Sequence, residues 1–316
     1  MTPPKCTRLD VRDAASAGAR PYRDAVNIPW SELAQRTHEL PPPGTLLPVL
    51  GPVTLAAAAV AWLRRAGRCA IAADDEIGAA RDEANVPPHN NSSLWAVGPA
   101  SLPASAGTEA RPTDAASSAR PYSSVAADGT APRGRLWEPA ALVAEAAAKL
   151  TPGRALDLGC GCGRDAVYLA TAGWRVTAVD VLPDALARGA ALAARYGAAH
   201  ARIRWHACDL EAATADDAAA NTVPGGPYEL VVLVRYLHRP LLARLAGWLR
   251  PGGVLIAETF TPEHRARHGK PAGDRVLPAD DWPALLPGFE LQRCDAAWRH
   301  DAHLTHVWAT ARREGT

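Results

Sequence analysis

The chain has 316 residues, of which 48% are hydrophobic and 21% charged, and its formal net charge is +1. This length accommodates two domains, each with its own core. So small a net charge gives no global reason to expect a nucleic-acid or membrane partner, although it leaves room for a local basic patch.

The N-terminus and the cysteines indicate the compartment. The first residues, Met-Thr-Pro-Pro-Lys-Cys, contain no apolar stretch of a secretory signal. The six cysteines are scattered along the chain, and two of them, Cys160 and Cys162, lie in a glycine-rich turn that a disulfide would obstruct. We therefore expect a cytoplasmic protein with reduced thiols.

Residues 1–88 are predicted to form a small α/β domain. The pattern indicates strands at 7–12, 46–50 and 69–73 and a helix at 55–66, with 25–33 as a loop that opens a helix. The uncharged run 46–63 just reaches the length of a membrane span. Proline and glycine near its start favour a buried strand followed by a buried helix, so no membrane partner is expected.

Two segments of this domain carry a resemblance. Leu9-Asp10-Val11-Arg12 and Ala25-Val26-Asn27-Ile28-Pro29 resemble the rhodanese domain. The resemblance places the cysteine nucleophile of rhodaneses at Leu50, in a six-residue loop, and leucine cannot carry a persulfide. The resemblance therefore implies an inactive rhodanese-like module that serves docking, dimerisation or a substrate lid, and Cys69 is expected to be a small buried hydrophobe.

Residues 89–134 are rich in Pro, Ser, Ala, Gly and Thr and are predicted to be a flexible linker, because they have too little apolar surface to offset ordering. Residues 135–316 are predicted to form a second domain with alternating helices and strands. The expected strands are 154–158, 174–180, 202–207, 228–234 and 254–260, followed by an antiparallel hairpin at 289–299 and 303–312, and the expected helices are 139–150, 165–172, 183–196 and 241–249.

The turn after the first of these strands decides the ligand class. Gly159, Gly161 and Gly163 alternate there, and glycine lets backbone N–H groups approach a ligand at a helix N-terminus. A dinucleotide site has the spacing G-x-G-x-x-G, whereas this turn is G-x-G-x-G and follows Asp157. A carboxylate there repels a pyrophosphate and accepts an ammonium group, and Asp180 is placed to accept ribose hydroxyls. A nucleoside with a cationic end, S-adenosylmethionine, fits this pattern.

These motifs resemble class I S-adenosylmethionine-dependent methyltransferases, and Arg164-Asp165-Ala-Val-Tyr-Leu-Ala resembles the tellurite-resistance-type branch. The resemblance implies a seven-stranded Rossmann-like α/β sheet with S-adenosylmethionine as cofactor. It implies that Asp209 accepts the adenine amine and that Leu210 donates its N–H to the ring. The implied cofactor-binding residues are Asp157, Gly159, Cys160, Gly161, Gly163, Arg164, Asp180, Val181, Asp209, Leu210 and Val234.

The segment after the strand 228–234 supplies the catalytic candidates. In doubly wound sheets ligands bind at the carboxyl ends of the strands, so this segment should face the methyl group. His238 is the candidate base, Tyr236 its orienting residue and Arg239 an anion-binding group. The alternative for His238 is a histidine that only hydrogen-bonds backbone. Arg135 and Trp137 are equally compatible with a lid and with a packing anchor.

No metal site is expected. Cys160 and Cys162 lack further ligands, and His303 and His306 should point to opposite faces of the hairpin, with His300 in its turn. The charged segment 261–281 is read as a solvated loop in preference to a closure over an acidic substrate.

A small-molecule methyl acceptor is favoured over an RNA substrate, because the sequence has no basic appendage that would bind RNA. The candidate acceptors are a thiol, a metalloid oxyanion or a hydroxyl. The alternative function is a non-catalytic scaffold or sensor that binds S-adenosylmethionine, and a nicotinamide oxidoreductase is disfavoured by Asp157. The sequence leaves the oligomeric state open.

Overall fold

Two β-sheets, one parallel and one mixed, organise the computed structural model, which describes residues 4–73, 134–212 and 223–312. The chain divides into two units, residues 1–75 with 130–316 and residues 76–129. The predicted linker, apart from Gly134, lies outside the described residues.

The N-terminal sheet has four strands in the order β2-β1-β3-β4, each parallel to its neighbour. Its elements are β1 (Arg8–Asp10), α1 (Ala14–Ala19), β2 (Ala25–Asn27), β3 (Leu47–Leu50), α2 (Val53–Arg65) and β4 (Ala70–Ala72). Residues 25–27, predicted as a loop, are thus a short strand, because they pair in register with β1. Two short 3-10 helices, Trp30–Glu32 and Thr37–Glu39, follow it.

Cys69 is exposed, so the prediction of a buried hydrophobe is wrong there. The physical reason is its place just before β4, which is an edge strand of the sheet. The uncharged run 46–63 folds as β3 and the 13-residue helix α2. Among the described residues, no helix has the length and hydropathy needed to span a membrane.

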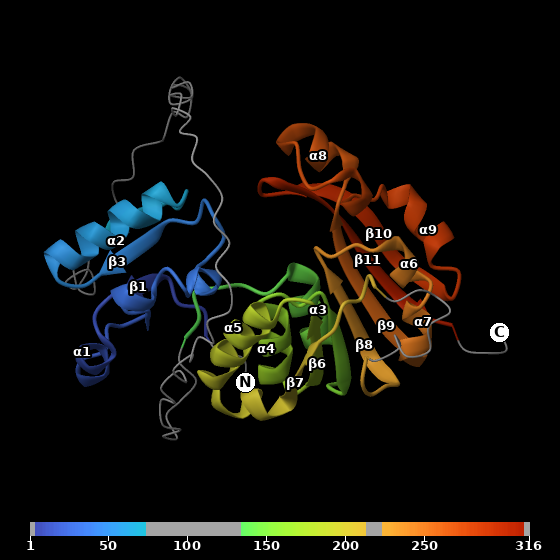
Figure 1. Ribbon diagram of the computed structural model, residues 1–316, viewed down its shortest axis with the longest axis horizontal. Coiled ribbons are helices and arrows are strands. Elements are labelled where there is room, and N and C mark those ends of the chain that lie inside the picture. Colours follow the sequence, from blue (N-terminus) through green and yellow to red (C-terminus); the bar gives the residue numbers. More distant parts are fainter. Residues whose placement is uncertain (1–3, 74–133, 213–222, 313–316) are drawn as a thin grey trace, which may run out of the picture. The chain divides into compact units, whose positions relative to one another are not determined.

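The second sheet has seven strands in the order β10-β11-β9-β8-β5-β6-β7, and β11 runs in the direction opposite to the other six (Figure 1). This is the predicted Rossmann-like sheet. Its strands are β5 (Arg154–Leu158), β6 (Arg175–Asp180), β7 (Ile203–Ala207), β8 (Tyr228–Val234), β9 (Leu249–Phe260), β10 (Phe289–Arg299) and β11 (Ala302–Ala311).

Helices cover both faces of this sheet. The helices α3 (Ala141–Lys149), α4 (Arg164–Thr171) and α5 (Pro183–Ala194) pack on one face through one buried apolar cluster, and α6 (Arg239–Leu242), α7 (Leu245–Trp248) and α9 (Trp282–Leu285) contribute to the cluster on the other (Figure 1). Successive strand residues point to opposite faces, so Leu156 and Leu158 enter one cluster and Ala155 the other.

Three elements differ from the sequence prediction. The single helix expected at 241–249 is two short helices, α6 and α7. The turn expected before Val254 is part of β9, because the backbone continues through a register irregularity opposite Tyr228 and Leu230. Within 261–281, expected as a loop, Thr261 caps α8 (Pro262–His268), and short 3-10 turns follow at Gly273–Arg275 and Ala279–Asp281.

The chain order reverses between β5 and β8: the strands β6 and β7 lie on one side, and β9 lies on the other. In such sheets the ligand site is the crevice at the carboxyl ends of the two central strands. The glycine turn after β5 and the segment after β8 therefore meet at one place.

Candidate active site

The glycine turn leaves β5 and enters α4 with three residues in the left-handed region. The φ angles of Gly159, Gly161 and Gly163 are 67°, 54° and 66°. The turn is held by the Cys160 N–H, which donates to the Val179 carbonyl at 3.0 Å, and by the Gly163 N–H, which donates to the Cys160 carbonyl at 2.9 Å. Any side chain at these positions is strained, so the sequence motif is explained by the backbone.

Close packing adds a second reason for glycine. A Cβ on Gly163 would lie 2.3 Å from the Trp205 ring, and one on Gly189 of α5 would lie 2.6 Å from the same ring. The indole therefore occupies the space of two absent side chains, and it keeps the glycine turn close to α5.

Asp157 is a buried carboxylate with an unused oxygen. Its residue is 2% exposed, and Oδ2 has no hydrogen-bond partner among the described residues. Burial raises the pKa of Asp157 well above its usual range, and the neighbouring Asp165 and Asp180 carboxylates add to this rise. A buried acceptor without a donor is costly, so the geometry fits a site completed by a cationic ligand group.

Asp180 holds the same turn from the end of β6. Its Oδ2 accepts the Gly161 N–H at 2.7 Å, and its Oδ1 accepts the Leu182 N–H at 2.9 Å. Each oxygen keeps a second lone pair, which is compatible with the predicted contact to ribose hydroxyls. Val181 and Leu182 beside it are 54% and 58% exposed, so an apolar rim borders this carboxylate.

The segment after β8 reaches the glycine turn. A Cβ on Gly159 would lie only 2.5 Å from Cγ of Tyr236, so the tyrosine ring lies directly against the turn. Burial and the nearby Glu211 raise the pKa of the Tyr236 phenol, which keeps it protonated at neutral pH. His238 is the N-cap residue of α6, and its Nδ1 lies 4.0 Å from Oε2 of Glu211.

Comparison with known proteins agrees with this geometry. Residues 155–253 match a family model described as "Methyltransferase domain".

This segment is a methyltransferase domain.

The match confirms the predicted enzyme class. A search of curated protein sequences found no match.

Several solved structures resemble this chain over about half of its length. The N-methyltransferase NodS from Bradyrhizobium japonicum WM9 is 18% identical, with 54% of this chain and 93% of that chain covered and a TM-score of 0.42. The magnesium protoporphyrin IX methyltransferase ChlM from Synechocystis PCC 6803, solved with bound SAM, is 21% identical, with 54% and 76% covered and a TM-score of 0.42. TehB from Haemophilus influenzae is 17% identical, with 54% and 61% covered and a TM-score of 0.43.

Two functional candidates in the methyltransferase domain escaped the sequence analysis. Arg275 binds Glu211 through both oxygens, with Nη1 to Oε1 at 2.5 Å and Nη2 to Oε2 at 2.7 Å. This pairing lowers the pKa of Glu211, so its carboxylate stays charged beside Tyr236 and His238. The sequence did not reveal this pair because its two residues lie far apart in the chain: Glu211 follows β7 and Arg275 follows α8.

A second polar cluster lies at the ends of β8 and β9, where Glu258 and His306 are buried and Arg235 is exposed. Arg235, with φ 55°, donates from Nε to Oε1 of Glu258 at 3.1 Å, and His306 Nε2 lies 3.0 Å from Oε2 of the same carboxylate. Burial acts to raise the pKa of Glu258, but the partners His306 and Arg235 outweigh it and lower that pKa. The polar residue inside the apolar strand β9 was the signal that could have revealed this cluster.

Arg239 is hydrogen-bonded to two backbone carbonyls. Its Nη1 donates to the Asp274 carbonyl and its Nη2 to the Val276 carbonyl, both at 2.8 Å. The guanidinium thus ties α6 to the segment after α8, and its predicted contact with an anion stays a prediction.

Other predicted site residues lie where expected, and their ligand contacts stay predictions. Asp209 Oδ1 accepts the Glu211 and Ala212 N–H groups at 2.9 and 3.2 Å, and Leu210 beside it is buried. Val234 ends β8, and Arg164 begins α4.

The lid and metal alternatives also have structural answers. Trp137 is 1% exposed and donates from Nε1 to the Tyr196 hydroxyl at 3.1 Å, which makes it a packing anchor. His303 Nδ1 lies 2.6 Å from Thr261 Oγ1, whereas His306 contacts Glu258, so the two histidines do point to opposite faces. Burial, together with Asp157 and Asp180, raises the pKa of the Cys160 thiol and disfavours a thiolate ligand.

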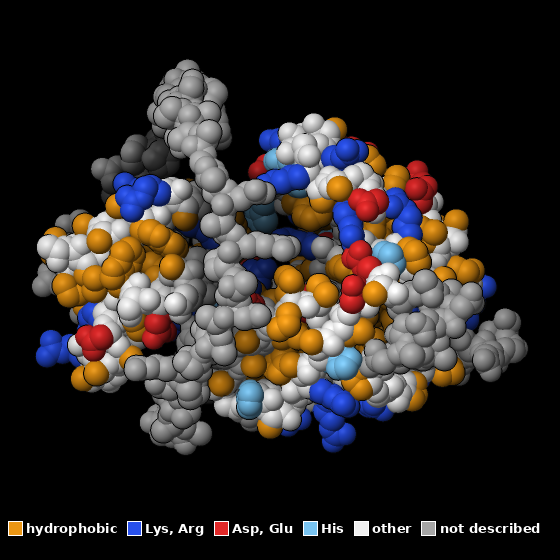
Figure 2. All heavy atoms as spheres, viewed as in Figure 1, with side chains coloured by type: hydrophobic (Ala, Val, Ile, Leu, Met, Phe, Trp, Pro, Cys, Tyr) orange, Lys and Arg blue, Asp and Glu red, His pale blue; other side chains and the backbone are white. Residues whose placement is uncertain are grey.

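Charged side chains of both signs lie around α8. Figure 2 shows Lys and Arg side chains gathered around α8, with Asp and Glu side chains beside them. The contacts explain part of this mixture, since Arg267 and His268 lie 3.8 and 3.7 Å from Asp301 Oδ1. An acidic acceptor would thus meet cations that are already partly paired.

Proposed function

We propose that the chain transfers the methyl group of S-adenosylmethionine to a small-molecule acceptor, either a thiol, a metalloid oxyanion or a hydroxyl. The observation that carries this proposal is the buried Asp157 oxygen just before the glycine turn, for which the described residues provide no donor. With Asp180 on the far side of that turn, the site has carboxylates for both an ammonium group and a ribose.

The cofactor, when bound, supplies an electrophilic methyl carbon. The chain's own residues have three tasks around it. Asp157 is placed to hold the cationic amino-acid end, and the backbone at Gly159 allows close approach. The Tyr236 ring borders the turn. Alignment of nucleophile and carbon supplies up to about 7 to 11 kcal/mol in favourable cases, so positioning is the main demand on the site.

His238 is the proposed base for acceptors that must lose a proton. Glu211 lies on its Nδ1 side at 4.0 Å, which leaves Nε2 available to the acceptor. Because the pKa of the Tyr236 phenol is raised, that hydroxyl serves as a donor and not as a base at neutral pH. A thiol or oxyanion that is already charged would not need His238.

The test is turnover of labelled S-adenosylmethionine with thiols, selenite, tellurite and phenolic hydroxyls, in the wild type and in His238→Ala. Methylation of a hydroxyl acceptor should fall at least about tenfold in His238→Ala and lose its dependence on the histidine charge. An unchanged rate and pH profile would remove His238 as a base. Cofactor binding without turnover of any acceptor would favour the non-catalytic sensor.

For residues 1–88 we propose a rhodanese-like module without sulfurtransferase activity, which serves docking or a lid. Leu50, at the position of the nucleophile, is 1% exposed, and α2 begins at Val53, so only Gly51 and Pro52 separate strand from helix. Such a connection has no room for a six-residue active loop. Thiosulfate:cyanide sulfurtransferase activity of the full chain would contradict this proposal.

A further inference from the structure

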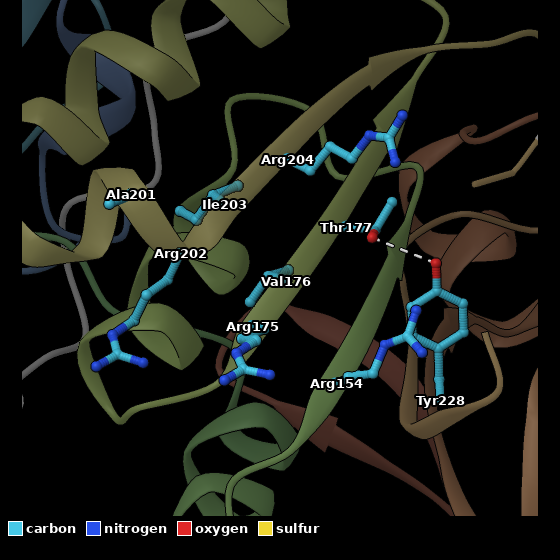
Figure 3. A pocket seen from close by; sticks show the side chains of 9 residues that line it. All are labelled: Arg154, Arg175, Val176, Thr177, Ala201, Arg202, Ile203, Arg204 and Tyr228. Atoms are coloured by element: carbon cyan, nitrogen blue, oxygen red, sulfur yellow. Dashed lines mark hydrogen bonds between the residues drawn. The ribbon is translucent and has the colours of Figure 1, made fainter. Parts of the chain in front are cut away.

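A cavity lies at the end of the sheet opposite the glycine turn. Its volume is about 380 Å³, and it lies over the amino-terminal halves of β5, β6 and β7. Figure 3 shows the side chains around it, which come from these strands, the preceding 3-10 turn and β8. The polar lining residues are Arg154, Arg175, Thr177, Arg202, Arg204 and Tyr228.

The register of the strands brings positive charges together. Arg154 is the direct partner of Arg175, and Thr177 is the direct partner of Arg204. Residues 175 and 177 are two apart on β6 and share a face. Adjacent strands are about 4.8 Å apart, so the bases of these side chains are neighbours on one face. Like charges in such positions oppose folding unless something neutralises them.

Nothing in the described part of the chain neutralises them. None of the four arginines forms an ion pair with a carboxylate there, although Arg154 donates to the Gly226 carbonyl at 2.9 Å and Arg202 to the Gly173 carbonyl at 3.4 Å. Arg175 and Arg204 are exposed. This contrasts with Arg275 and Arg293, which both bind carboxylates in a bidentate way.

Two buried hydroxyls complete the cavity. The Tyr228 hydroxyl donates to the Pro224 carbonyl and lies 3.2 Å from Thr177 Oγ1, and Tyr228 and Thr177 are 1% and 8% exposed. In the view of Figure 3 this hydroxyl pair lies between the guanidinium groups of Arg204 and Arg154. The surface thus combines forked N–H donors with fixed hydroxyls.

We propose that this cavity binds a compact, multiply charged phosphate-type oxyanion, such as the phosphate groups of a phosphorylated small molecule. Guanidinium forks match phosphate oxygens in a bidentate way. The volume is near the lower end of the range for small-molecule sites, about 300 to 1,000 Å³. A concave site in a chain of net charge +1 favours such a ligand over the extended contact that a nucleic acid needs.

The probe is inorganic pyrophosphate, titrated calorimetrically into the full chain at low salt. We expect saturable binding at one site that weakens with added NaCl because exposed charges are screened. In the double variant Arg175→Gln/Arg204→Gln the affinity should fall about 100-fold, since each lost charged contact costs about tenfold. Arg65→Gln removes the same charge from the exposed end of α2 and should change the affinity less than twofold.

Three results would overturn the proposal. They are no saturable binding by the wild type at millimolar pyrophosphate, equal binding by the double variant, and competition between pyrophosphate and S-adenosylhomocysteine, which would place the anion at the glycine turn. Preferential binding of a single-stranded RNA oligonucleotide that is lost in the same variant would assign the arginines to nucleic acid instead. Binding of S-adenosylhomocysteine is measured in parallel. A failure of the proposed methyl transfer would therefore be distinguished from a failure of pyrophosphate binding.

Discussion

The Tyr236 ring occupies the space where a side chain at Gly159 would stand, with only 2.5 Å between the tyrosine Cγ and the position of a Cβ. The two residues come from the ends of β5 and β8, the central strands of the sheet. This contact joins the cofactor turn to the segment that carries the catalytic candidates. A change at either residue should therefore be felt at both.

Gly159→Ala should impair cofactor binding and destabilise the fold. Its φ of 67° strains any L side chain, and the new methyl group would displace Tyr236. We expect a loss of about 2 kcal/mol in the free energy of unfolding and at least tenfold weaker binding of S-adenosylhomocysteine. Gly247→Ala, in α7 with nothing within 4 Å of the added Cβ, is the control and should be neutral or slightly stabilising. Denaturant unfolding and calorimetry measure both quantities, and equal behaviour of the two variants would count against the steric argument.

Asp157→Asn should separate stability from binding. Removal of a buried carboxylate whose oxygen lacks a donor should stabilise the empty protein by about 1 to 3 kcal/mol, while the loss of charge should weaken the cationic ligand at least tenfold. Parallel thermal unfolding and ligand titration give the two values. Weaker stability together with unchanged binding would mean that Asp157 has a structural role only.

The pH dependence of the same site follows from the direction of its pKa shift. The pKa of Asp157 in the folded state lies above the unfolded value of 3.8. Its contribution is therefore most favourable to folding below that unfolded pKa and is lost as the pH rises through the folded pKa. Binding of an ammonium group needs the ionised form, so affinity should rise with pH over this window. In Asp157→Asn the rise should be absent, and a retained rise would assign it to another group.

Glu211→Gln should lower the catalytic rate more than it weakens cofactor binding. The carboxylate binds both ends of the Arg275 fork and lies beside Tyr236 and His238. We expect kcat to fall about 10- to 100-fold, with the affinity for S-adenosylhomocysteine within about threefold of the wild type. Glu290→Gln, an exposed change on β10, is the matched control. Equal loss in cofactor affinity and rate would indicate a collapse of the pocket.

Arg293→Gln should reveal a pH-dependent ion pair away from the site. Arg293 binds both oxygens of Glu145 at 2.7 and 2.9 Å, and together with Lys149 it lowers the pKa of Glu145 to about 2. This stabilisation is present above the unfolded pKa of 4.5 and is lost as the pH falls through about 2. The pair is partly exposed, so we expect a loss of only about 0.5 to 1 kcal/mol at pH 7. A loss of equal size at pH 2 in chemical unfolding would contradict the assignment.

Local sequence patterns predicted most elements of the second sheet. Alternating apolar residues and the glycine turn placed β5, α4, β6 and α5 within one or two residues of their observed ends. Stretches without a regular pattern of apolar residues were harder to predict. Residues 25–27 became a strand because β1 offers hydrogen bonds to them, and Arg250 to Gly253 lie within β9 because Leu249 and Val254 on either side of them pair with β8. Neither partner is visible in the local pattern.

The sequence by itself determined the glycine turn, the acids at positions 157 and 180, and therefore the class of cofactor, because φ angles and carboxylate chemistry belong to single residues and their spacing. Only the tertiary structure decided what lies against that turn. It brought Tyr236 onto Gly159, paired Arg275 with Glu211, turned Arg239 toward backbone carbonyls, and left the arginines of three strands together without carboxylates in the described part of the chain. The physical reason is that such contacts join residues far apart in the chain, and strand order and register alone determine which of them become neighbours.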